Sequence, residues 1–483
     1  MAAKEKGAKL IVLDPRLSNF AALATEWLPL KPGTDLAFLL ALMHVIVKEE
    51  LYDKAFVEAN TVGFAELKAE AAKYSPEWAA PLTDIPAETI TRIARELAAA
   101  KPAAVIDPCW HSTRSINSMQ AMRAAACLNA LLGNLGAKGG LSLGSGVKLA
   151  KPEELPLLGP ALQKPKAKRF DGAGGEKWPL AKGLGMVQTL PDHILSEKPY
   201  PVKAYFVSHH NPVRSCPNTN RFIESLKKPE LMVAIDVQMS DTAYFAQYIL
   251  PESTYLERFD PVQAEGPVVA LRQPAVKPLH DTKGEDEIIT ELARAAGLGP
   301  YFNFTLEQFN DALLAPTGVT HRDLLKQGVI KFEIPKPQGL PELKTASGKI
   351  ELFSAALQAA GGSPVPRWEP PAVEPGANDF QLLHGHVPMH THTSTQNNAW
   401  LNALMPENEL WIHPGRARRL GIKTGDLLEV ASEVGKVQIK ANVTEGIRPD
   451  CVFMAHGFGC LSPLQKFILR FLILAAGLPV NLF

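Results

Sequence analysis

The stretch that decides the fold occurs twice in this chain, as DPRLSNFAALATEWLPL from Asp14 and as DVQMSDTAYFAQYILPE from Asp236. Each copy follows a short apolar run, at 10–13 or at 231–235. Such runs ending at a turn are typical of buried parallel strands. A single unit reflects only the common strand–turn–helix pattern, whereas identities in ungapped register favour duplication. The matching residues are Asp14, Ser18, Ala21, Ala24, Leu28 and Pro29 with Asp236, Ser240, Ala243, Ala246, Leu250 and Pro251.

The repeated aspartate predicts a nucleotide site in each copy. An Asp at the carboxyl end of a parallel strand lies in the crevice where open α/β sheets bind ligands. Its oxygens only accept hydrogen bonds, so they suit paired donors such as a guanine edge or two ribose hydroxyls. No GxGxxG motif follows either strand, which disfavours a nicotinamide dehydrogenase. The repeat therefore predicts an α/β fold with two Rossmann-like parallel-sheet domains, each with one nucleotide site.

The rest of the chain extends the α/β pattern and then changes to β. Apolar periodicity predicts helices at 35–50, 86–99, 120–132 and 285–296. Short alternating strands near the end predict a C-terminal β-barrel: FQLLHGH, ELWIHP, DLLEVAS, KVQIKANV and VFMAH. The expected organisation is a first domain at 1–104, a second at 105–362 with a long surface excursion near 148–190, a linker at 363–377 and the barrel at 378–483.

Composition narrows the class of protein. Lys plus Arg and Asp plus Glu are both 50, so no bulk charge favours nucleic acid as a partner. The five cysteines form no CxxC pair and no cluster with histidines, which predicts neither disulfides nor an iron–sulfur or zinc site on them. The N-terminus has no apolar signal region, and the apolar tail stretch 467–478 is too short to span a bilayer. We expect neither a signal peptide nor a transmembrane segment in this chain.

Several segments carry a family resemblance: KLIVLDPR, WLPLKPGTDLAFLLALMHVIV, LNALLGNLGAKGGL, NPVRSCPNTNRF, AIDVQMSDTAYFAQYILPESTYLER and NELWIHPGRARRLGIKTGDLLEVAS. In this order they resemble the molybdopterin oxidoreductase family, which includes dimethyl sulfoxide reductase. The resemblance implies bis(molybdopterin guanine dinucleotide) with molybdenum or tungsten, in agreement with two nucleotide sites. NPVRSCPNT and HTHTSTQNNAWLNALMPENELWIHP look closest to the polysulfide and thiosulfate reductase branch.

The same resemblance assigns cofactor contacts to the residues that match the family's motifs. The helix amides after Gly33 are natural phosphate donors in their own right. The contacts to one guanosine and its phosphates are Asp14, Arg16, Gly33, Thr34 and Asp35. The contacts to the second nucleotide are Asn211 and Asp236, and either Glu285 or Asp286 adds a guanine contact. The contacts to the pterins are Gly385, His386, His392 and Thr393.

Histidines at 384, 386, 390 and 392 raise a second possibility, because alternate imidazoles on a strand could bind zinc. No carboxylate or thiol completes the set nearby, so we favour hydrogen-bond donors to pterin and phosphate and predict no metal ligand. In sulfur-reducing relatives, the region around WHSTR contributes a basic residue to the metal pocket. His111 and Arg114 are therefore predicted to hold an anionic substrate and deliver protons. A surface turn with a solvated Arg114 is the alternative.

Two segments that precede KLIVLD in relatives do not occur here: the cysteine ligands of a [4Fe–4S] cluster and the residue that ligates the metal. We therefore expect a piece of a longer protein or a split reading frame, with little turnover by the chain alone. The full protein is expected to reduce polysulfide, thiosulfate, tetrathionate or arsenate by two electrons. A formate dehydrogenase-type member and a cofactor-binding scaffold without turnover are the alternatives. The resemblance implies an iron–sulfur subunit, a membrane quinol-oxidising subunit and the periplasmic face of the membrane.

Overall fold

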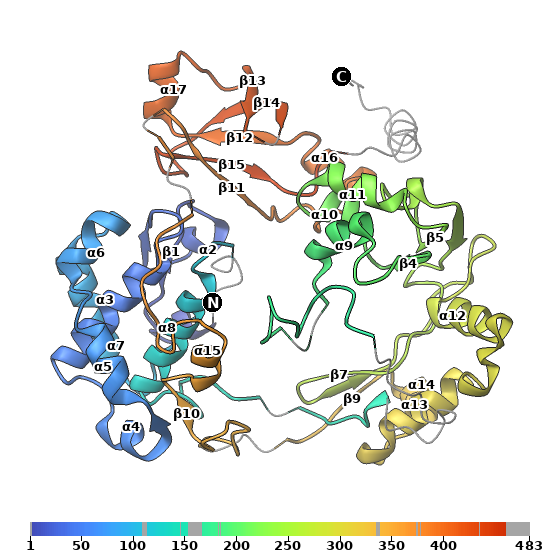
Figure 1. Cartoon of the computed structure of the whole chain (residues 1–483), viewed down its shortest axis with the longest axis horizontal. Coiled ribbons are helices and arrows are strands. Elements are labelled where there is room, and N and C mark those ends of the chain that lie inside the picture. The colour runs from blue at the N-terminus through green and yellow to red at the C-terminus, as the bar shows by residue number, and fades with distance from the viewer. Residues whose placement is uncertain are drawn as a thin grey trace. The chain divides into compact units, whose positions relative to one another are not determined.

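The computed structural model describes residues 2–108, 114–144, 146–152, 167–181, 183, 185–334, 339–372, 375–376, 378–433 and 435–459. The chain forms two compact units, each built from three separate stretches (Figure 1). Unit 1 comprises Met1–Leu143, Pro337–Gly385 and Asn408–Ala455. Unit 2 comprises Gly144–Lys336, His386–Glu407 and His456–Phe483. Among the described residues, no helix combines the length and apolarity that crossing a membrane requires.

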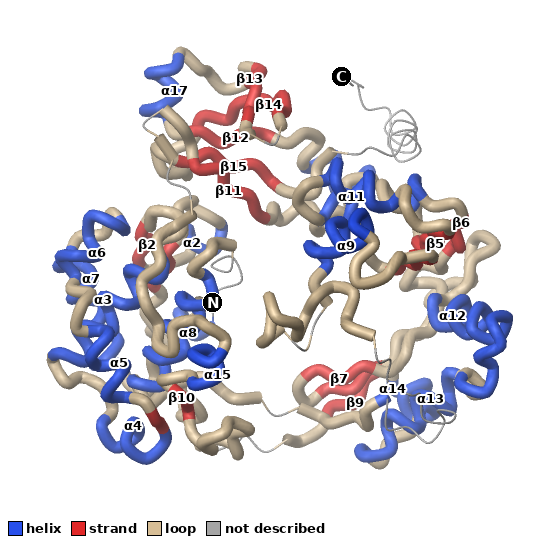
Figure 2. Tube along the Cα trace, viewed as in Figure 1, coloured by secondary structure: helices blue, strands red, loops and turns tan. Residues whose placement is uncertain are grey.

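The core of unit 1 surrounds one apolar helix, α3 (Asp35–Lys48), which confirms the helix predicted at 35–50. Every residue from 36 to 47 is buried, and a helix that is apolar on all faces must be enclosed by other elements. Helices α5, α6, α7 and α8 pack around it (Figure 2). The other helices of unit 1 are α1 (Ala2–Glu5), α2 (Asn19–Ala22), α4 (Lys54–Asn60), α5 (Phe64–Ala71), α6 (Pro76–Thr83), α7 (Ala87–Ala100), α8 (Ser118–Leu131), α15 (Ala355–Ala359) and α17 (Pro414–Leu420).

The strands of unit 1 form three sheets. β1 (Ile11–Leu13) pairs in parallel with β2 (Glu26–Leu28), and β3 (Thr61–Val62) pairs in parallel with β10 (Ile350–Glu351). The third sheet has the order β11-β15-β12-β14-β13. Its strands are β11 (Gln381–Gly385), β12 (Glu409–Ile412), β13 (Leu427–Ala431), β14 (Lys436–Val443) and β15 (Cys451–Ala455).

These five strands confirm the β segments predicted near the C-terminus. Each begins and ends within two residues of the alternating stretch that predicted it. Alternation places Leu410 and Ile412 of β12 in the core beside Val452 of β15. Within the described residues, no pairing joins the edge strands β11 and β13. A C-terminal sheet is therefore established, and its closure into a barrel stays a prediction.

Unit 2 contains a parallel sheet, β4-β5-β6, and an antiparallel sheet, β7-β8-β9. The strands are β4 (Ala204–Ser208), β5 (Leu231–Asp236), β6 (Tyr248–Pro251), β7 (Gln263–Glu265), β8 (Val268–Ala270) and β9 (Val329–Lys331). The helices are α9 (Leu190–Ser196), α10 (Pro212–Ser215), α11 (Thr219–Leu226), α12 (Glu285–Ala293), α13 (Leu306–Leu314), α14 (His321–Gln327) and α16 (Ala399–Leu404). Shorter turns are the 3-10 helices η3 (Val187–Thr189), η4 (Ala243–Phe245), η6 (Gly299–Tyr301) and η7 (Ala315–Thr317) and the π-helix η5 (Arg294–Leu298).

Candidate functional site

The two copies of the repeat have the same local structure, one in each unit. Leu13 pairs with Leu28 in the first copy, and Ile235 pairs with Leu250 in the second, so both crossovers have equal length. The serine of each copy caps the following turn: the hydroxyl of Ser18 accepts from the amide of Ala21 at 3.2 Å, and Ser240 accepts from Ala243 at 3.2 Å. The match extends from sequence to register and capping, which supports duplication.

The repeated aspartates also have matching contacts. Oδ1 of Asp14 accepts from the amide of Arg16 at 2.9 Å, and Oδ1 of Asp236 accepts from the amide of Gln238 at 3.2 Å. These bonds fix both carboxyl groups at the carboxyl ends of parallel strands. In the described part of the chain, no protein donor contacts either Oδ2. Each site therefore leaves one carboxylate oxygen, Oδ2, available to accept a hydrogen bond from an N–H or O–H group of a ligand.

In unit 1, Arg16 lies against aromatic rings of the C-terminal sheet. Its guanidinium carbon is 3.9 Å from the ring centre of Phe453 and 5.3 Å from that of Trp411. Burial lowers the pKa of Arg16, and the charge of Asp14 acts in the opposite direction. The amide of Leu17 donates to the carbonyl of Gly446 at 2.9 Å. These contacts hold the Asp14–Arg16 turn in place before any ligand binds.

The amino end of α3 lies close to this turn. Burial raises the pKa of Asp35, and the nearby charge of Asp14 raises it further. The backbone of Gly33 has φ +79°, and its carbonyl accepts from the Asn117 side chain at 3.0 Å. Thr34 is buried, and its hydroxyl donates to the Lys31 carbonyl rather than capping α3. The first amides of α3 thus have no side-chain cap, as a phosphate-binding helix start requires.

In unit 2, charged residues gather where β4 and β6 end. Glu252 directly follows β6 and is buried; its Oε1 contacts Arg258 and lies 2.8 Å from Nε2 of His209. Oε2 of Glu285 lies 3.6 Å from the same nitrogen, and its Oε1 accepts from the Ser208 hydroxyl. These residues line the same strand ends as Asp236, so they extend the candidate second nucleotide site.

Two of the residues predicted to contact the cofactor in unit 2, Asn211 and Thr393, are linked by hydrogen bonds to the second copy of the repeat. Oδ1 of Asn211 accepts from the hydroxyl of Thr242 at 2.7 Å and from its amide at 3.2 Å. Nε of Arg214 donates to Asp241 at 2.5 Å, and both side chains are buried. The Arg214 guanidinium also donates to the carbonyl of Thr393 at 3.4 Å. Asn211 and Thr393 are therefore connected to the second repeat.

Asp286 lies in the first turn of α12, next to Glu285. Burial raises the pKa of Asp286, and the amides of the helix start partly oppose this effect. A half-buried carboxyl group of this kind can donate or accept a hydrogen bond according to its protonation.

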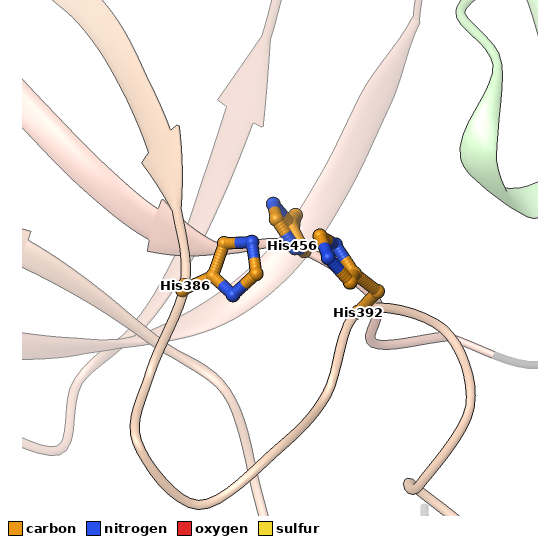
Figure 3. Close-up of side chains that lie close together, drawn as sticks. All are labelled: His386, His392 and His456. Carbon is orange, nitrogen blue, oxygen red and sulfur yellow. Dashed lines mark hydrogen bonds between the residues drawn. The ribbon is translucent and has the colours of Figure 1, made fainter. Parts of the chain in front are cut away.

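The predicted pterin contacts fall at the end of β11 and in the loop that follows it. Gly385 ends β11 and pairs with Ala455, which ends β15. His386, His392 and His456 lie together in unit 2, and Figure 3 shows their rings side by side. The ring centre of His386 lies 4.1 Å from the ring centre of His392 and 4.5 Å from that of His456.

The structure separates the remaining candidates. Nη1 of Arg114 lies 2.9 Å from Nδ1 and 2.7 Å from Nε2 of His384. His384 therefore contacts Arg114 and is not part of the group formed by His386, His392 and His456. The other proposed catalytic residue, His111, lies outside the described residues.

Sequence comparison within the chain could have found one residue that we missed. Glu252 aligns with Leu30 of the first copy, and both are buried. A charge at a position that packing fills with leucine points to a binding role. His209 and Arg258 carry no such signal, because only folding brings them to Glu252. His456 lies 64 residues after His392, too far apart for a local motif to reveal.

Comparisons with known proteins agree with this geometry. The sequence model of the molybdopterin oxidoreductase family matches residues 1–295, and that of the molydopterin dinucleotide binding domain matches 380–481. The chain therefore belongs to the molybdopterin oxidoreductase family, as the resemblance predicted.

Individual relatives within the family have different activities. The chain is 37% identical to thiosulfate reductase molybdopterin-containing subunit PhsA of Salmonella typhimurium, over 95% of this chain and 66% of that protein. It is 29% identical to the F420-dependent formate dehydrogenase subunit alpha of Methanocaldococcus jannaschii, over 95% of this chain and 69% of that protein. The solved structure of acetylene hydratase from Pelobacter acetylenicus matches with a TM-score of 0.80 at 28% identity, covering 95% of this chain and 68% of that one. The chain thus spans about two thirds of the length of these relatives.

Proposed function

We propose that this chain is the cofactor-binding part of a catalytic subunit that reduces a sulfur compound, polysulfide, thiosulfate or tetrathionate, or arsenate. The observation that carries the proposal is the duplicated aspartate turn at the end of a parallel strand, in a chain of this family. Similarity to a thiosulfate reductase subunit favours a sulfur substrate.

The donors and acceptors in both units fit a bis(molybdopterin guanine dinucleotide). Asp14 and Asp236 each offer an acceptor oxygen to a guanosine, and the start of α3 offers amides to phosphate. Oε1 of Gln396, in the loop after β11, is buried and has no hydrogen-bond partner among the described residues, so a ligand group could satisfy it. The residues that would hold the cofactor are Asp14, Arg16, Gly33, Thr34, Asp35, Asn211, Asp236, Asp286, Gly385, His386, His392 and Thr393.

When bound, molybdenum or tungsten in this cofactor supplies two-electron redox chemistry. For thiosulfate, the balanced change is S₂O₃²⁻ + 2e⁻ + H⁺ → SO₃²⁻ + HS⁻, in which the S–S bond breaks. The guanidinium of Arg114 would hold the dianion, and His111 would deliver the proton. The exposed imidazole of His384 lies against Arg114 and would restrict where its guanidinium points.

The remaining parts of the proposal follow from the resemblance. The electrons would come from an iron–sulfur subunit and a membrane quinol-oxidising subunit at the periplasmic face. A [4Fe–4S] cluster in the full-length protein would connect them to the metal. We expect little turnover by the chain without these parts.

A formate dehydrogenase-type activity is the alternative, and the similarity to a formate dehydrogenase subunit supports it. The test is an anaerobic assay of the native holoprotein, with reduced viologen for thiosulfate, tetrathionate, polysulfide and arsenate, and oxidised viologen for formate. The proposal predicts dye oxidation with one of the first four. Formate oxidation without any reduction of these substrates would contradict it.

A further inference from the structure

Three imidazoles from two distant parts of the chain form a compact cluster in unit 2. One ring nitrogen of each of His386, His392 and His456 lies within 4.8 Å of the others. Nδ1 of His392 and Nε2 of His456 are 3.2 Å apart, and the planes of these two stacked rings are nearly parallel, with an angle of 5° between them. His386 and His392 are exposed, so an ion can reach the cluster from solvent.

Chain geometry explains why His386 and His456 meet. Each directly follows the last residue of a strand, Gly385 of β11 or Ala455 of β15, and these two residues are partners in a parallel ladder. Neighbouring parallel strands run about 4.8 Å apart. The residues that follow them therefore begin side by side.

Gly457 allows the backbone of His392 to pack close enough for its imidazole to reach His386 and His456. The backbone of Gly457 has φ +90°, and a Cβ there would lie 1.8 Å from the carbonyl oxygen of His392. Gln396 donates from Nε2 to that same carbonyl at 2.6 Å. His392 itself has φ +48°, in the left-handed region. Close backbone packing and a local turn thus hold the third imidazole in position before any ligand binds.

The cluster has the chemistry of a site for a borderline transition metal. Zinc binds imidazole nitrogen at about 2.0–2.1 Å in a tetrahedron, which puts ligand nitrogens about 3.4 Å apart. The observed 3.2 Å between His392 and His456 is close to that edge. Three protein ligands with a fourth position open to water are typical of accessible zinc sites.

We propose that His386, His392 and His456 together bind one divalent transition-metal ion, with Zn²⁺ as the representative probe. The proposal departs from our sequence prediction of no metal ligand, because His456 replaces His384 and His390 in the cluster. The proposed function assigns His386 and His392 to the pterin cofactor, so ion and cofactor would compete for them, and the metal site proposed here belongs to the chain without its cofactor. Its test measures metal binding and does not depend on the activity of the loaded protein.

The test is equilibrium binding of Zn²⁺ and Co²⁺ to the whole chain, purified without cofactor and freed of metal with a chelator. We expect one ion per chain, with the visible absorption of four-coordinate Co²⁺. Substitution of His386, His392 or His456 by Ala should each weaken binding at least tenfold, since each removes a ligand. The exposed His280 lies outside the cluster, and His280→Ala should bind as the parent chain does. Lowering the pH from 7.5 to 5.5 should also weaken binding, because imidazoles must lose their protons to bind a metal.

Two further variants keep the result interpretable. His386→Gln retains a polar side chain at an exposed position, so its circular dichroism and melting temperature should match the parent while its metal binding falls. Equal metal binding by the parent and all three cluster variants would overturn the proposal. Loss of binding in His209→Ala alone would also overturn it, because the ion would then belong to the group His209, Glu252 and Glu285.

Discussion

Replacement of Gly457 by alanine is the most informative single change to the histidine cluster, because a matched control lies two residues away. Both Gly457 and Gly459 have positive φ, +90° and +85°. A Cβ on Gly457 would lie 1.8 Å from the His392 carbonyl oxygen and 2.7 Å from Nε2 of Gln396. A Cβ on Gly459 would meet no atom of the described residues within 4 Å. The two variants therefore share backbone strain and differ in the clash.

The expected magnitudes follow from these contacts. A positive φ costs a non-glycine residue about 1–2 kcal/mol, which applies to both variants. In Gly457→Ala, the His392 carbonyl must also retreat by roughly 1.6 Å to reach an ordinary contact. That movement breaks the hydrogen bond that the Gln396 side chain donates to the His392 carbonyl, which contributes about 1 kcal/mol to stability. We therefore expect a local destabilisation of about 2–3 kcal/mol for Gly457→Ala and about 1–2 kcal/mol for Gly459→Ala.

Two measurements separate these variants. Hydrogen exchange of peptides from 387–398 should accelerate more in Gly457→Ala than in Gly459→Ala, because only the first displaces His392. Co²⁺ affinity should fall about tenfold or more in Gly457→Ala and stay near the parent value in Gly459→Ala. If both variants gave the same exchange rates and the same Co²⁺ affinity, Gly457 would not position His392, and the reasoning would be wrong.

Three other substitutions test the contacts that surround the two candidate nucleotide sites. Asp241→Asn should destabilise unit 2 by about 3–5 kcal/mol, because it removes a negative charge that pairs with the buried guanidinium of Arg214. Thermal melts of Asp241→Asn, of an Arg214 variant and of the variant with both changes measure the coupling between the two residues. Asn117→Ala should cost about 1–3 kcal/mol and reduce cofactor retention, since the buried Asn117 side chain donates to the carbonyls of both Gly33 and Glu369. Asp35→Asn should raise the melting temperature at pH 7.5 but change it little at pH 3. Burial raises the pKa of Asp35, so its ionisation destabilises the folded chain at neutral pH, and this penalty disappears below its ordinary pKa.

The local parts of the fold were predictable because their signals lie within short windows. The apolar run of α3 and the alternation in β11–β15 gave elements whose bounds agree within two residues. The repeat predicted two strand–turn units, and matching caps at Ser18 and Ser240 confirm their local structure. Periodicity and capping depend on neighbours in sequence, which is why these features could be inferred directly.

Features that depend on distant contacts could not be predicted in the same way. The sequence placed His384 with His386 and His392, whereas folding brings His384 to Arg114 and brings His456 to the other two. The cluster around Glu252 likewise assembles from residues far apart in the chain. Strand pairing and loop packing decide these contacts, and a single sequence carries no direct signal of either.

We propose that this chain holds two guanine nucleotides of a molybdopterin cofactor through its duplicated aspartate turns. The most direct measurement is the amount of GMP released by acid hydrolysis of the chain, purified from a host that makes the cofactor, together with its molybdenum and tungsten content. The account predicts two GMP per metal ion in the parent chain and a clear loss of GMP in Asp14→Ala and Asp236→Ala. A parent chain with neither GMP nor metal, or an Asp236→Ala variant that still holds two GMP, would contradict it.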